Sequence, residues 1–260
     1  MRIAIVGFGK MGHMIRGIAE KRGNHVVLTA DPYADDAIIK TGDAAVVAEA
    51  IKKADVDGII EFTNPDVVLT NIKAFLPLGI PLVVGTTGWM THLPEVKECA
   101  SNCGGSLFYA ANFSVGVNLF YKIVKEAASL ISDYDEYDCA VWEAHHNTKV
   151  DSPSGTALEI ARRIMAEMPS KTEVVSGNFQ GKPAKNQIQV ASTRVGCVPG
   201  THTVFFDSAA DTIELTHTAR SREGLALGAV RACEWLSSGI YSGKLTKGSV
   251  YTMDDLLGGK

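Results

Sequence analysis

Apolar residues in the first third of the chain recur with spacings that predict strands alternating with helices. Arg2–Val6 form a short apolar run, and from Met11 to Ala19 the apolar side chains fall three and four residues apart, as on one face of a helix. His25–Ala30 then predicts a second strand. Short apolar strands separated by helices are typical of a parallel, doubly wound sheet, because both faces of such a sheet are covered.

The same alternation continues to about residue 113. Gly58–Phe62 predicts a strand, Asp66–Leu78 a helix, and Pro81–Val84 and Ser106–Tyr109 two further strands. Ligands of doubly wound sheets bind at the carboxyl ends of the strands. The loops that follow the strands are therefore candidate walls of a binding site: Gly7–Gly12, Thr63–Pro65, Gly85–Gly88 and Ala110–Phe113.

From Ser114 onward the pattern changes. Val115–Ser132 and Ser154–Met168 predict helices, with the strand Asp138–Trp142 between them. Partly alternating, β-rich runs follow: Gln187–Thr193, Thr201–Phe206 and Thr212–Thr218. They suggest an open mixed or antiparallel sheet, and an uncovered face of a broad sheet needs a partner. We therefore expect this sheet to pair with other subunits.

A last long helix, Glu223–Ser237, and the segment Tyr251–Leu257 close the chain. The predicted fold class is α/β. It combines an N-terminal, Rossmann-like doubly wound parallel sheet with a C-terminal α+β substrate and oligomerisation domain that contains an open mixed sheet.

Composition narrows the function classes. With 260 residues, 46% of them apolar and 21% charged, the chain can bury a sizeable core and form two modest domains. A net charge of -4 without a basic stripe gives no reason to expect nucleic-acid binding. No apolar run approaches the roughly 20 residues that span a bilayer. The chain opens directly into the predicted strand Arg2–Val6, so we expect no cleaved signal. Five scattered cysteines are typical of reduced thiols in a cytoplasmic protein.

The first loop carries a dinucleotide-binding pattern. Gly7-Phe8-Gly9-Lys10-Met11-Gly12 is a GxGxxG between a predicted strand and a predicted helix. Its glycines serve a tight turn, close approach of the backbone to a pyrophosphate, and close packing of helix on strand. Asp31 follows Gly12 by 19 residues and ends the second strand, where its carboxylate can accept hydrogen bonds from the adenosine ribose.

The richest chemistry lies in the segment Glu143–Ala157, which contains His145, His146, Lys149 and a Pro-Ser-Gly-Thr turn. Its first half offers proton donors, and its second half offers hydroxyl and backbone N–H groups at the start of a helix. A helix N-terminus binds anions because its first N–H groups have no internal partner. The segment therefore suggests an enzyme whose carboxylate-bearing substrate gains or loses a proton.

These motifs together closely resemble the 4-hydroxy-tetrahydrodipicolinate reductase family, formerly called dihydrodipicolinate reductases, of the bacterial and plant lysine pathway. The resemblance covers nearly the whole chain. It rests on the following segments: Gly7–Gly12, Phe62-Thr63, Gly85–Gly88, Ala111–Asn118, Glu143–Ala157, Thr216-His217 and Ser221-Arg222.

The resemblance implies an organisation and an activity. It implies a dinucleotide-binding domain over residues 1–113, joined by the C-terminal segment 222–260, and a substrate-binding and tetramerisation domain over residues 114–221. The implied reaction reduces a cyclic imine with two carboxylates, using NADH or NADPH in the diaminopimelate route of lysine biosynthesis. The implied assembly is a homotetramer built through the sheets.

Site residues are carried over by the same resemblance. His145 and Lys149 match the proton-donating pair, and His146 matches a substrate-binding histidine. Ser154, Gly155 and Thr156 would hold a substrate carboxylate at the helix N-terminus. Cofactor-binding residues would be Gly7, Phe8, Gly9, Lys10, Met11, Gly12, Asp31, Gly85, Thr86, Thr87, Ala110, Ala111, Asn112 and Phe113.

The sequence gives no functional role to the remaining histidines and does not indicate a metal site. His13, His25, His92 and His202 are expected to be surface or packing residues. Of the adjacent pair His145 and His146, the alternation of a strand would turn one ring inward and the other outward. No third ligand lies at a usable spacing from this pair, so we expect no zinc site.

Two departures from the family pattern bear on cofactor choice. The family often has Gly-Arg-Met-Gly in a glycine loop that is one residue longer, where this chain has Lys10. In members that use both cofactors, a basic residue commonly follows the acid that ends the second strand. Here Asp31 is followed by Pro32 and Tyr33, so we expect NADH to be preferred over NADPH. A third difference, Ser152 in place of the usual alanine, is expected to be neutral.

Two alternative functions remain open from the residues. Another two-domain NAD(P)-dependent dehydrogenase, such as a homoserine- or aspartate-dehydrogenase-like enzyme, would share the architecture. A non-catalytic, cofactor-sensing protein would share the first domain. The histidine and lysine positions followed by the Pro-Ser-Gly-Thr turn favour the reductase over both.

Overall fold

The computed structural model describes residues 1–179 and 181–258. The chain forms two compact units. One contains Met1–Val115 together with the segment from Glu223 onward, and the other contains Gly116–Arg222. Each unit has its own sheet and its own hydrophobic core.

The first unit is built on a six-stranded parallel sheet with strand order β11-β5-β4-β3-β1-β2. Its strands are β1 (Arg2–Val6), β2 (His25–Ala30), β3 (Gly58–Glu61), β4 (Leu82–Val84), β5 (Leu107–Tyr109) and β11 (Val250–Tyr251). Its helices are α1 (Lys10–Lys21), α2 (Ala44–Lys53), α3 (Val68–Phe75), α4 (Leu93–Cys103), α7 (Glu223–Tyr241) and α8 (Met253–Leu256), with 3-10 turns at Leu76–Leu78 and Met90–His92.

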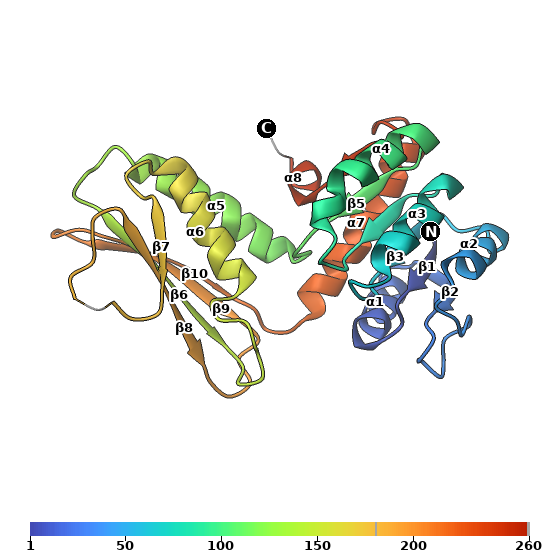
Figure 1. The fold of residues 1–260 in the computed structure, drawn as a ribbon, viewed down its shortest axis with the longest axis horizontal. Helices are drawn as coiled ribbons and strands as arrows, with labels where there is room; N and C mark the ends of the chain where they lie inside the picture. Colours follow the sequence, from blue (N-terminus) through green and yellow to red (C-terminus); the bar gives the residue numbers. More distant parts are fainter. Residues whose placement is uncertain (180, 259–260) are drawn as a thin grey trace. The chain divides into compact units, whose positions relative to one another are not determined.

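Alternate residues of each strand enter opposite cores, which is why the strands are apolar throughout. Ile3 and Ile5 of β1 face a core shared with α1 and α7, whereas Ala4 and Val6 face a core shared with α2, α3 and α4. Figure 1 shows these helices around the sheet of this unit. The sheet is therefore covered on both faces, as a doubly wound fold requires.

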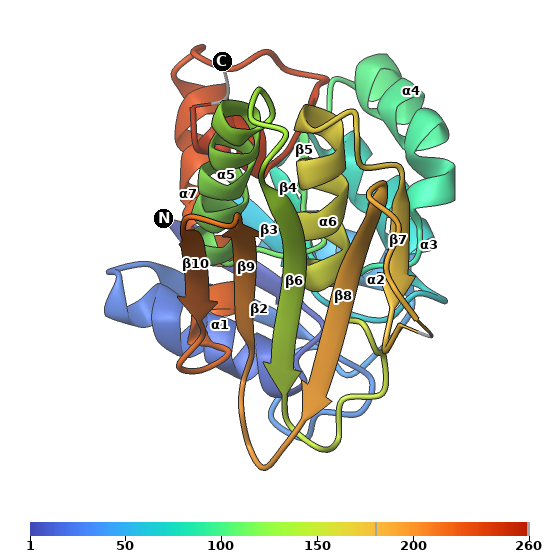
Figure 2. The same ribbon diagram turned by 90° about the vertical axis from the view of Figure 1, so that its left-hand side faces the viewer.

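The second unit is a mixed five-stranded sheet with order β10-β9-β6-β8-β7. Its strands are β6 (Asp138–His145), β7 (Glu173–Ser176), β8 (Gln187–Arg194), β9 (Thr201–Asp207) and β10 (Thr212–Thr218). β8 is parallel to β6 and β7, and β9 is antiparallel to β6 and β10. The helices α5 (Val115–Ile131) and α6 (Gly155–Glu167) pack their buried residues against one face of this sheet (Figure 2).

The predicted fold class is confirmed, and the differences are local. The predicted helix Asp66–Leu78 is shorter, because α3 begins at Val68 and Pro77 turns its end into a 3-10 segment. β6 continues three residues beyond Trp142 and so carries His145. The elements α2, α4 and β7 are not predicted by the sequence pattern.

α7 lies against the loop that follows β5, and one glycine makes this close packing possible. A Cβ atom at Gly228 would lie 1.7 Å from the carbonyl oxygen of Phe113, and backbone cannot yield as a flexible side chain can. We expect Gly228→Ala to lower the free energy of unfolding by roughly 1–3 kcal/mol, the usual cost of overpacking. Urea unfolding of the purified variant measures this.

Gly17→Ala in α1 is the matched control. A Cβ atom there meets nothing within 4 Å among the described residues, so alanine should stabilise the helix by up to about 1 kcal/mol. Equal stability of Gly228→Ala and the wild type would contradict this account of the α7 packing.

Candidate active site

In the first unit, the glycines of the loop after β1 make contacts that no other residue would permit. Gly7 has φ +89, and a Cβ atom there would lie 2.1 Å from the carbonyl oxygen of Phe62. A Cβ atom on Gly12 would lie 2.3 Å from the carbonyl oxygen of Gly7, which is how closely α1 packs on its own loop. Gly9, by contrast, would meet nothing within 4 Å among the described residues. Its lack of a side chain leaves the N-terminus of α1 open to a ligand.

Asp31 ties this loop to the loop after β2. Its Oδ2 accepts the backbone N–H of Phe8 at 2.8 Å, and its Oδ1 accepts those of Tyr33 at 2.8 Å and Ala34 at 3.1 Å. Each carboxylate oxygen can accept more than one hydrogen bond, so ribose hydroxyls can still bind. Asp31 therefore holds the two loops together and also presents its carboxylate to a ligand.

A pocket of about 370 Å³ opens beside Asp31. Gly9, Asp31 and Tyr33 line one part of it, and Thr63 and Asn64 from the loop after β3 line another. Its position at the carboxyl ends of β1, β2 and β3 fits the adenosine half of a dinucleotide. The open surface at Gly9 and this pocket are the two features of this unit that fit a pyridine nucleotide.

The remaining predicted cofactor loops lie at the ends of β4 and β5. A Cβ atom on Gly85 would lie 2.0 Å from the ring of Phe62, so the far edge of the phenyl ring packs against this backbone. Thr86 is buried, and its carbonyl oxygen accepts the indole N–H of Trp89 at 2.9 Å, whereas Thr87 is exposed. Phe113 is buried against Phe62, while Ala110, Ala111 and Asn112 are at least partly exposed.

Glu61 at the end of β3 is a buried acid that the sequence analysis gave no role. Its Oε1 accepts the amide of Asn71 at 3.2 Å and the backbone N–H of Thr63 at 3.3 Å. Burial raises the pKa of this carboxyl, and its hydrogen bonds, that of Thr63 first, only partly offset this effect. Glu61 thus joins the loop after β3 to Asn71 of α3.

In the second unit, the face of the sheet that packs on α5 and α6 changes from apolar to polar along the strands. Val141, Val190 and Val204 occupy one buried row across β6, β8 and β9. Two residues further along β6, the equivalent row is Ser192, Glu143 and His202, continued on β10 by His217. The next row contains Arg194 and His145. The alternation that builds the core therefore also directs these polar side chains inward.

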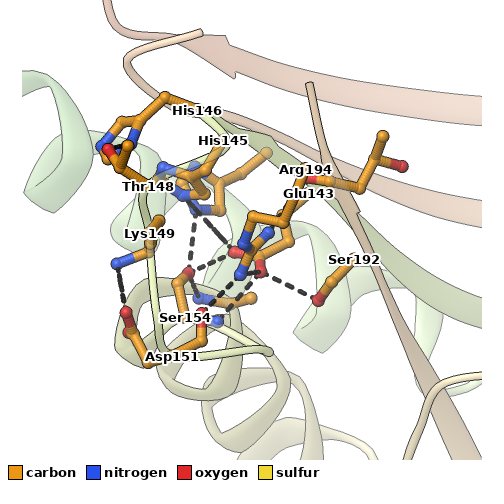
Figure 3. Close-up of polar contacts among 12 residues, drawn as sticks. Glu143, His145, His146, Thr148, Lys149, Asp151, Ser154, Ser192 and Arg194 are labelled. Carbon is orange, nitrogen blue, oxygen red and sulfur yellow. Dashed lines mark hydrogen bonds and ion pairs between the residues drawn. The ribbon is translucent and has the colours of Figure 1, made fainter. Parts of the chain in front are cut away.

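Glu143 is the centre of this polar end (Figure 3). It is fully buried. Its Oε1 accepts the Ser154 backbone N–H at 2.9 Å, the Ser192 hydroxyl at 2.9 Å and the Arg194 guanidinium at 3.0 Å. Its Oε2 accepts the Ser154 hydroxyl. Burial by itself would raise the pKa of Glu143, but hydrogen bonds led by those from His202 and Ser154 outweigh it and hold this pKa well below its usual range.

His145 lies at the end of β6 with its ring buried against the Glu143 carboxylate. Its Nε2 is 3.5 Å from Glu143 Oε2 and 3.4 Å from His202 Nε2. A Cβ atom on Gly200 would lie 2.8 Å from His145 Cε1, so only glycine there leaves room for this ring. Burial and the nearby charge of His202 lower the pKa of His145 to about 4. The imidazole is therefore neutral at pH 7 in the ligand-free protein.

His146 and Lys149 lie on the loop after β6, outside the buried cluster. The ring of His146 is half-buried, with Nδ1 2.8 Å from the Thr148 hydroxyl. One ring of the adjacent histidine pair is thus buried and the other partly exposed. The Lys149 ammonium lies 2.8 Å from an Asp151 carboxylate oxygen, and this contact, more than any other, lowers the pKa of Asp151.

The start of α6 completes this part of the site. Ser154 caps the helix, because its hydroxyl accepts the Ala157 N–H at 3.2 Å while donating to Glu143. Ser154 is almost fully buried, so its side chain is committed to Glu143. The hydroxyl of Thr156 bonds to Tyr121, and burial raises the pKa of that phenol to about 12 despite this bond.

Glu143, His145 and His202 are also the residue types that bind a metal, and their ligating atoms lie within 4.8 Å of one another. The Arg194 guanidinium, however, already neutralises the Glu143 carboxylate, and the charge of Lys149 is close enough to lower the pKa of His145. A metal ion would be repelled by both of these positive charges. The ionisable groups of the cluster are therefore better suited to binding protons than to binding a metal ion.

Three members of the cluster were missed by the sequence analysis, namely Ser192, Arg194 and His202, and Glu143 was not given a role. A signal existed for His202. In Thr201–Asp207, His202 is in phase with the buried Val204 and Phe206, so alternation alone placed it inward. Ser192 and Arg194 follow Val190 in the same way. Of the other histidines, His13, His25 and His92 are exposed, as expected.

A Rossmann-type sheet with a glycine loop, together with an ionisable cluster on a second sheet, defines a pyridine-nucleotide-dependent oxidoreductase. Residues 1–113 match the family profile described as dihydrodipicolinate reductase, N-terminus, and residues 116–257 match that described as dihydrodipicolinate reductase, C-terminus. The chain belongs to the dihydrodipicolinate reductase family. Among the described residues, none of the helices has the length and apolar character needed to cross a membrane.

Similar proteins agree with this assignment. A 4-hydroxy-tetrahydrodipicolinate reductase of Christiangramia forsetii is 36% identical over 99% of this chain and 98% of its own length. One from Archaeoglobus fulgidus is 37% identical over 99% of this chain and 100% of its own. The fold matches a dipicolinate-bound dihydrodipicolinate reductase from Paenisporosarcina sp. TG-14, with a TM-score of 0.74 at 21% identity over 97% of each chain.

Removing the charge at the centre of the cluster should destabilise the protein. Glu143→Gln cannot pair with Arg194, and loss of one partner of a buried ion pair costs about 3–5 kcal/mol. Urea unfolding at pH 7 measures the change. Glu20→Gln in α1 is the matched control, because both Glu20 and its partner Arg16 are exposed and such pairs contribute about 1 kcal/mol or less. A similar small loss for both variants would contradict the central role of Glu143.

Proposed function

We propose that this protein reduces 4-hydroxy-tetrahydrodipicolinate to tetrahydrodipicolinate with NADH or NADPH, in the diaminopimelate route of lysine biosynthesis. The observation that carries the proposal is that His145 and the N-terminus of α6 both contact one buried carboxylate, Glu143, while Lys149 lies on the loop between them and pairs with Asp151. Proton donors beside an anion-binding helix start suit a substrate that carries carboxylates and must be protonated. Membership of the family supports the same reaction.

The hydroxyl group of the substrate would first leave as water together with a hydrogen from the neighbouring ring carbon. When bound, the reduced nicotinamide would then supply a hydride to the unsaturated ring carbon. The protein must then supply a proton to the developing enamine or ring nitrogen. Lys149 and His145 are proposed as the donors. The Lys149 ammonium would also stabilise negative charge as it develops on the ring.

His145 is neutral in the ligand-free protein, so its acidity must be set when the substrate binds. Two substrate carboxylates close to the ring would favour the protonated imidazole and would raise its pKa from about 4. Substrate binding would thereby protonate His145, which would then donate this proton to the substrate. Lys149 would exchange its partner Asp151 for a substrate carboxylate in the same step.

The substrate carboxylates are proposed to bind at the start of α6 and beside His146. The backbone N–H groups of Gly155 and Thr156 lie in the first turn of α6, where the helix does not use them internally. That of Gly155 bonds to the Asp151 carboxylate in the ligand-free protein, and a substrate carboxylate would take the place of Asp151. Because the Ser154 hydroxyl is committed to Glu143, we assign Ser154 a role through its backbone and through Glu143 rather than through direct side-chain contact.

In the first unit, we propose that the backbone of Gly7–Gly12 holds the pyrophosphate and that Asp31 binds the adenosine ribose. Thr86, Thr87 and the loop Ala110–Phe113 are proposed to line the nicotinamide site. NADH is the proposed preferred cofactor, because Asp31, Asp35 and Asp36 would face the extra phosphate of NADPH as like charges. Lys10 and His13 are the opposing groups at this surface.

Assembly and location complete the proposal. The face of the second sheet away from α5 and α6 presents partly exposed Trp142 and Phe205, and we propose that it pairs with other subunits in a homotetramer. All five cysteines are unpaired, which fits a protein of the reducing cytoplasm.

Truncating the proton donors tests the function directly. In a turnover assay with freshly generated condensation product and reduced cofactor, Lys149→Ala and His145→Ala should each lower kcat by about 10²–10⁴-fold, the usual contribution of general acid catalysis. Cofactor affinity should hardly change, because neither residue belongs to the first unit. Near-full turnover in both variants would refute the assignment, and no turnover in the wild type would refute the function.

Pyridine-2,6-dicarboxylate should compete with the substrate, because it is planar and carries two carboxylates at equivalent ring positions. Thr156→Val keeps the side-chain volume but removes the hydroxyl, so we expect weaker inhibitor binding in calorimetry. Tyr121→Phe is the matched control, since it removes the phenol that bonds to Thr156 and leaves the threonine intact. Unchanged affinity in Thr156→Val would exclude this hydroxyl as a ligand.

Cofactor preference follows from charge at the adenosine site. We expect kcat/KM to be roughly ten-fold higher with NADH than with NADPH, about 1.4 kcal/mol, because salt screens a partly exposed repulsion. Steady-state kinetics with both cofactors measure the ratio. Equal values or a preference for NADPH would mean that Lys10 outweighs Asp31, and Lys10→Ala should then remove the NADPH activity selectively.

A further inference from the structure

His13 on α1 bridges the glycine loop and the loop after β2. Its Nδ1 lies 2.8 Å from the carbonyl oxygen of Gly9, and its Nε2 lies 2.9 Å from a carboxylate oxygen of Asp36. The imidazole stacks on the ring of the buried Phe8, with 4.1 Å between the ring centroids. These contacts hold the His13 ring in one position, although both His13 and Asp36 are exposed to solvent.

The two polar contacts of His13 indicate that its ring is protonated. Both partners, a carbonyl oxygen and a carboxylate, accept hydrogen bonds, and a neutral imidazole has only one N–H to donate. The imidazolium satisfies both. Consistently, the bonds to Gly9 and then to Asp36 raise the pKa of His13 above its ordinary value of 6.5. The ring therefore gains and loses its charge close to neutral pH.

The same ring lines an open recess of about 730 Å³ beside Asp31. Asp31 also lines the pocket of about 370 Å³ that fits the adenosine half of a dinucleotide. In NADPH the extra phosphate replaces the hydrogen of a ribose hydroxyl, and this is the hydroxyl that an acid in the position of Asp31 binds in NAD-dependent proteins. A 2′-phosphate must therefore lie beside Asp31, and the recess at His13 offers the space for it.

Protonation of His13 changes the charge of this recess. The charged side chains that line it are of both signs: Asp31, Asp35, Asp36, Lys10 and His13. Arg16, one turn further along α1, adds positive charge near the ring. The charged contact of α1 with α7, between Arg22 and Glu234, lies at the other end of α1. When His13 takes up a proton, the negative charge of the recess therefore falls by one unit.

We propose that His13 is a specificity-determining residue whose imidazolium stabilises the 2′-phosphate of NADPH beside Asp31, so that the use of NADPH relative to NADH rises as the pH falls. The inference rests on the proposed function and adds a regulation to its cofactor site. In the complex, the Nε2–H of His13 would donate to a phosphate oxygen in place of Asp36. The Nδ1–H would stay on the Gly9 carbonyl oxygen.

The direction of the effect follows from the charges. Above the pKa of His13 the ring is neutral, and the phosphate faces three aspartates with Lys10 as the nearest opposing charge in the recess. Below this pKa the imidazolium offsets part of that repulsion. NADH carries no charge at this position, so its binding changes little by this route. Any pH dependence of the chemical step is common to both cofactors and cancels in the ratio of their kcat/KM values.

Steady-state kinetics with both cofactors, from about pH 6.5 to about pH 8.5, test the proposal. We expect the NADPH to NADH ratio of kcat/KM to fall about two- to five-fold over this range, the usual size of an exposed charge interaction. A phosphate monoester itself titrates near pH 6, so the range stays above that value. A ratio that stays constant or rises with pH in the wild type would overturn the proposal.

Two substitutions of His13 separate its charge from its contacts. His13→Gln keeps an N–H donor towards Asp36 without a charge, so the ratio should be low at about pH 6.5 and nearly independent of pH. His13→Lys is charged throughout the range and should keep a high ratio at about pH 8.5. A merely structural role of His13 predicts the same pH dependence in both variants as in the wild type, and that result would contradict the proposal.

His25→Gln is the matched control. His25 is also exposed, but it lies at the start of β2, whereas Asp31 follows the end of this strand. Its replacement removes a histidine from the same unit without touching the recess. The ratio and its pH dependence should stay those of the wild type.

Binding of cofactor fragments separates this inference from the proposed function, because it needs no turnover. In calorimetry, the affinity for adenosine 2′,5′-bisphosphate relative to adenosine 5′-monophosphate should be higher at about pH 6.5 than at about pH 8.5, and His13→Gln should remove most of this difference. If the difference is found but the condensation product is not reduced, the proposed function fails and the phosphate site stands. If the product is reduced with both cofactors but their ratio does not depend on His13, the proposed function stands and this inference fails. Absence of both turnover and fragment binding would overturn both.

Discussion

The second unit depends on keeping one fully buried carboxylate, that of Glu143, ionised. Such a group costs several kcal/mol to bury unless it is paired and hydrogen-bonded. The donors that satisfy it come from the start of α6, from β8 and from β9. Bonds to one side chain therefore join three strands and a helix start.

The same bonds place the reactive groups. His145 follows Glu143 by two residues, so it projects from the same face of β6 and lies beside the same carboxylate. Ser154, which caps α6, fixes the N–H groups of Gly155 and Thr156 relative to that ring. A change that weakened the Glu143 network would therefore lower the stability of this unit and disturb the proposed proton donor and the proposed anion site together.

The first unit offers its proposed ligand a different kind of interaction. Its ligand is proposed to be an anionic cofactor, and the protein offers backbone N–H groups instead of a network of charged side chains. That requires close approach between backbones, which glycines at positions 7 and 12 permit, and a bare helix start at Gly9. Asp31 then joins two loops through three backbone amides, so the acid that is proposed to bind the ribose also holds the pocket in shape.

The sequence by itself determined the strand and helix pattern, the glycine loop and the family, because these depend on spacing between near neighbours. The run Glu143–Ala157 could be recognised for the same reason, since its reactive residues are contiguous in the chain. Only the tertiary structure decided that Ser192, Arg194 and His202, 49 to 59 positions away from Glu143, share its carboxylate. Their inward direction was encoded in the alternation of β8 and β9, but which strands lie beside β6, and in which register, depends on how the whole sheet buries its apolar face.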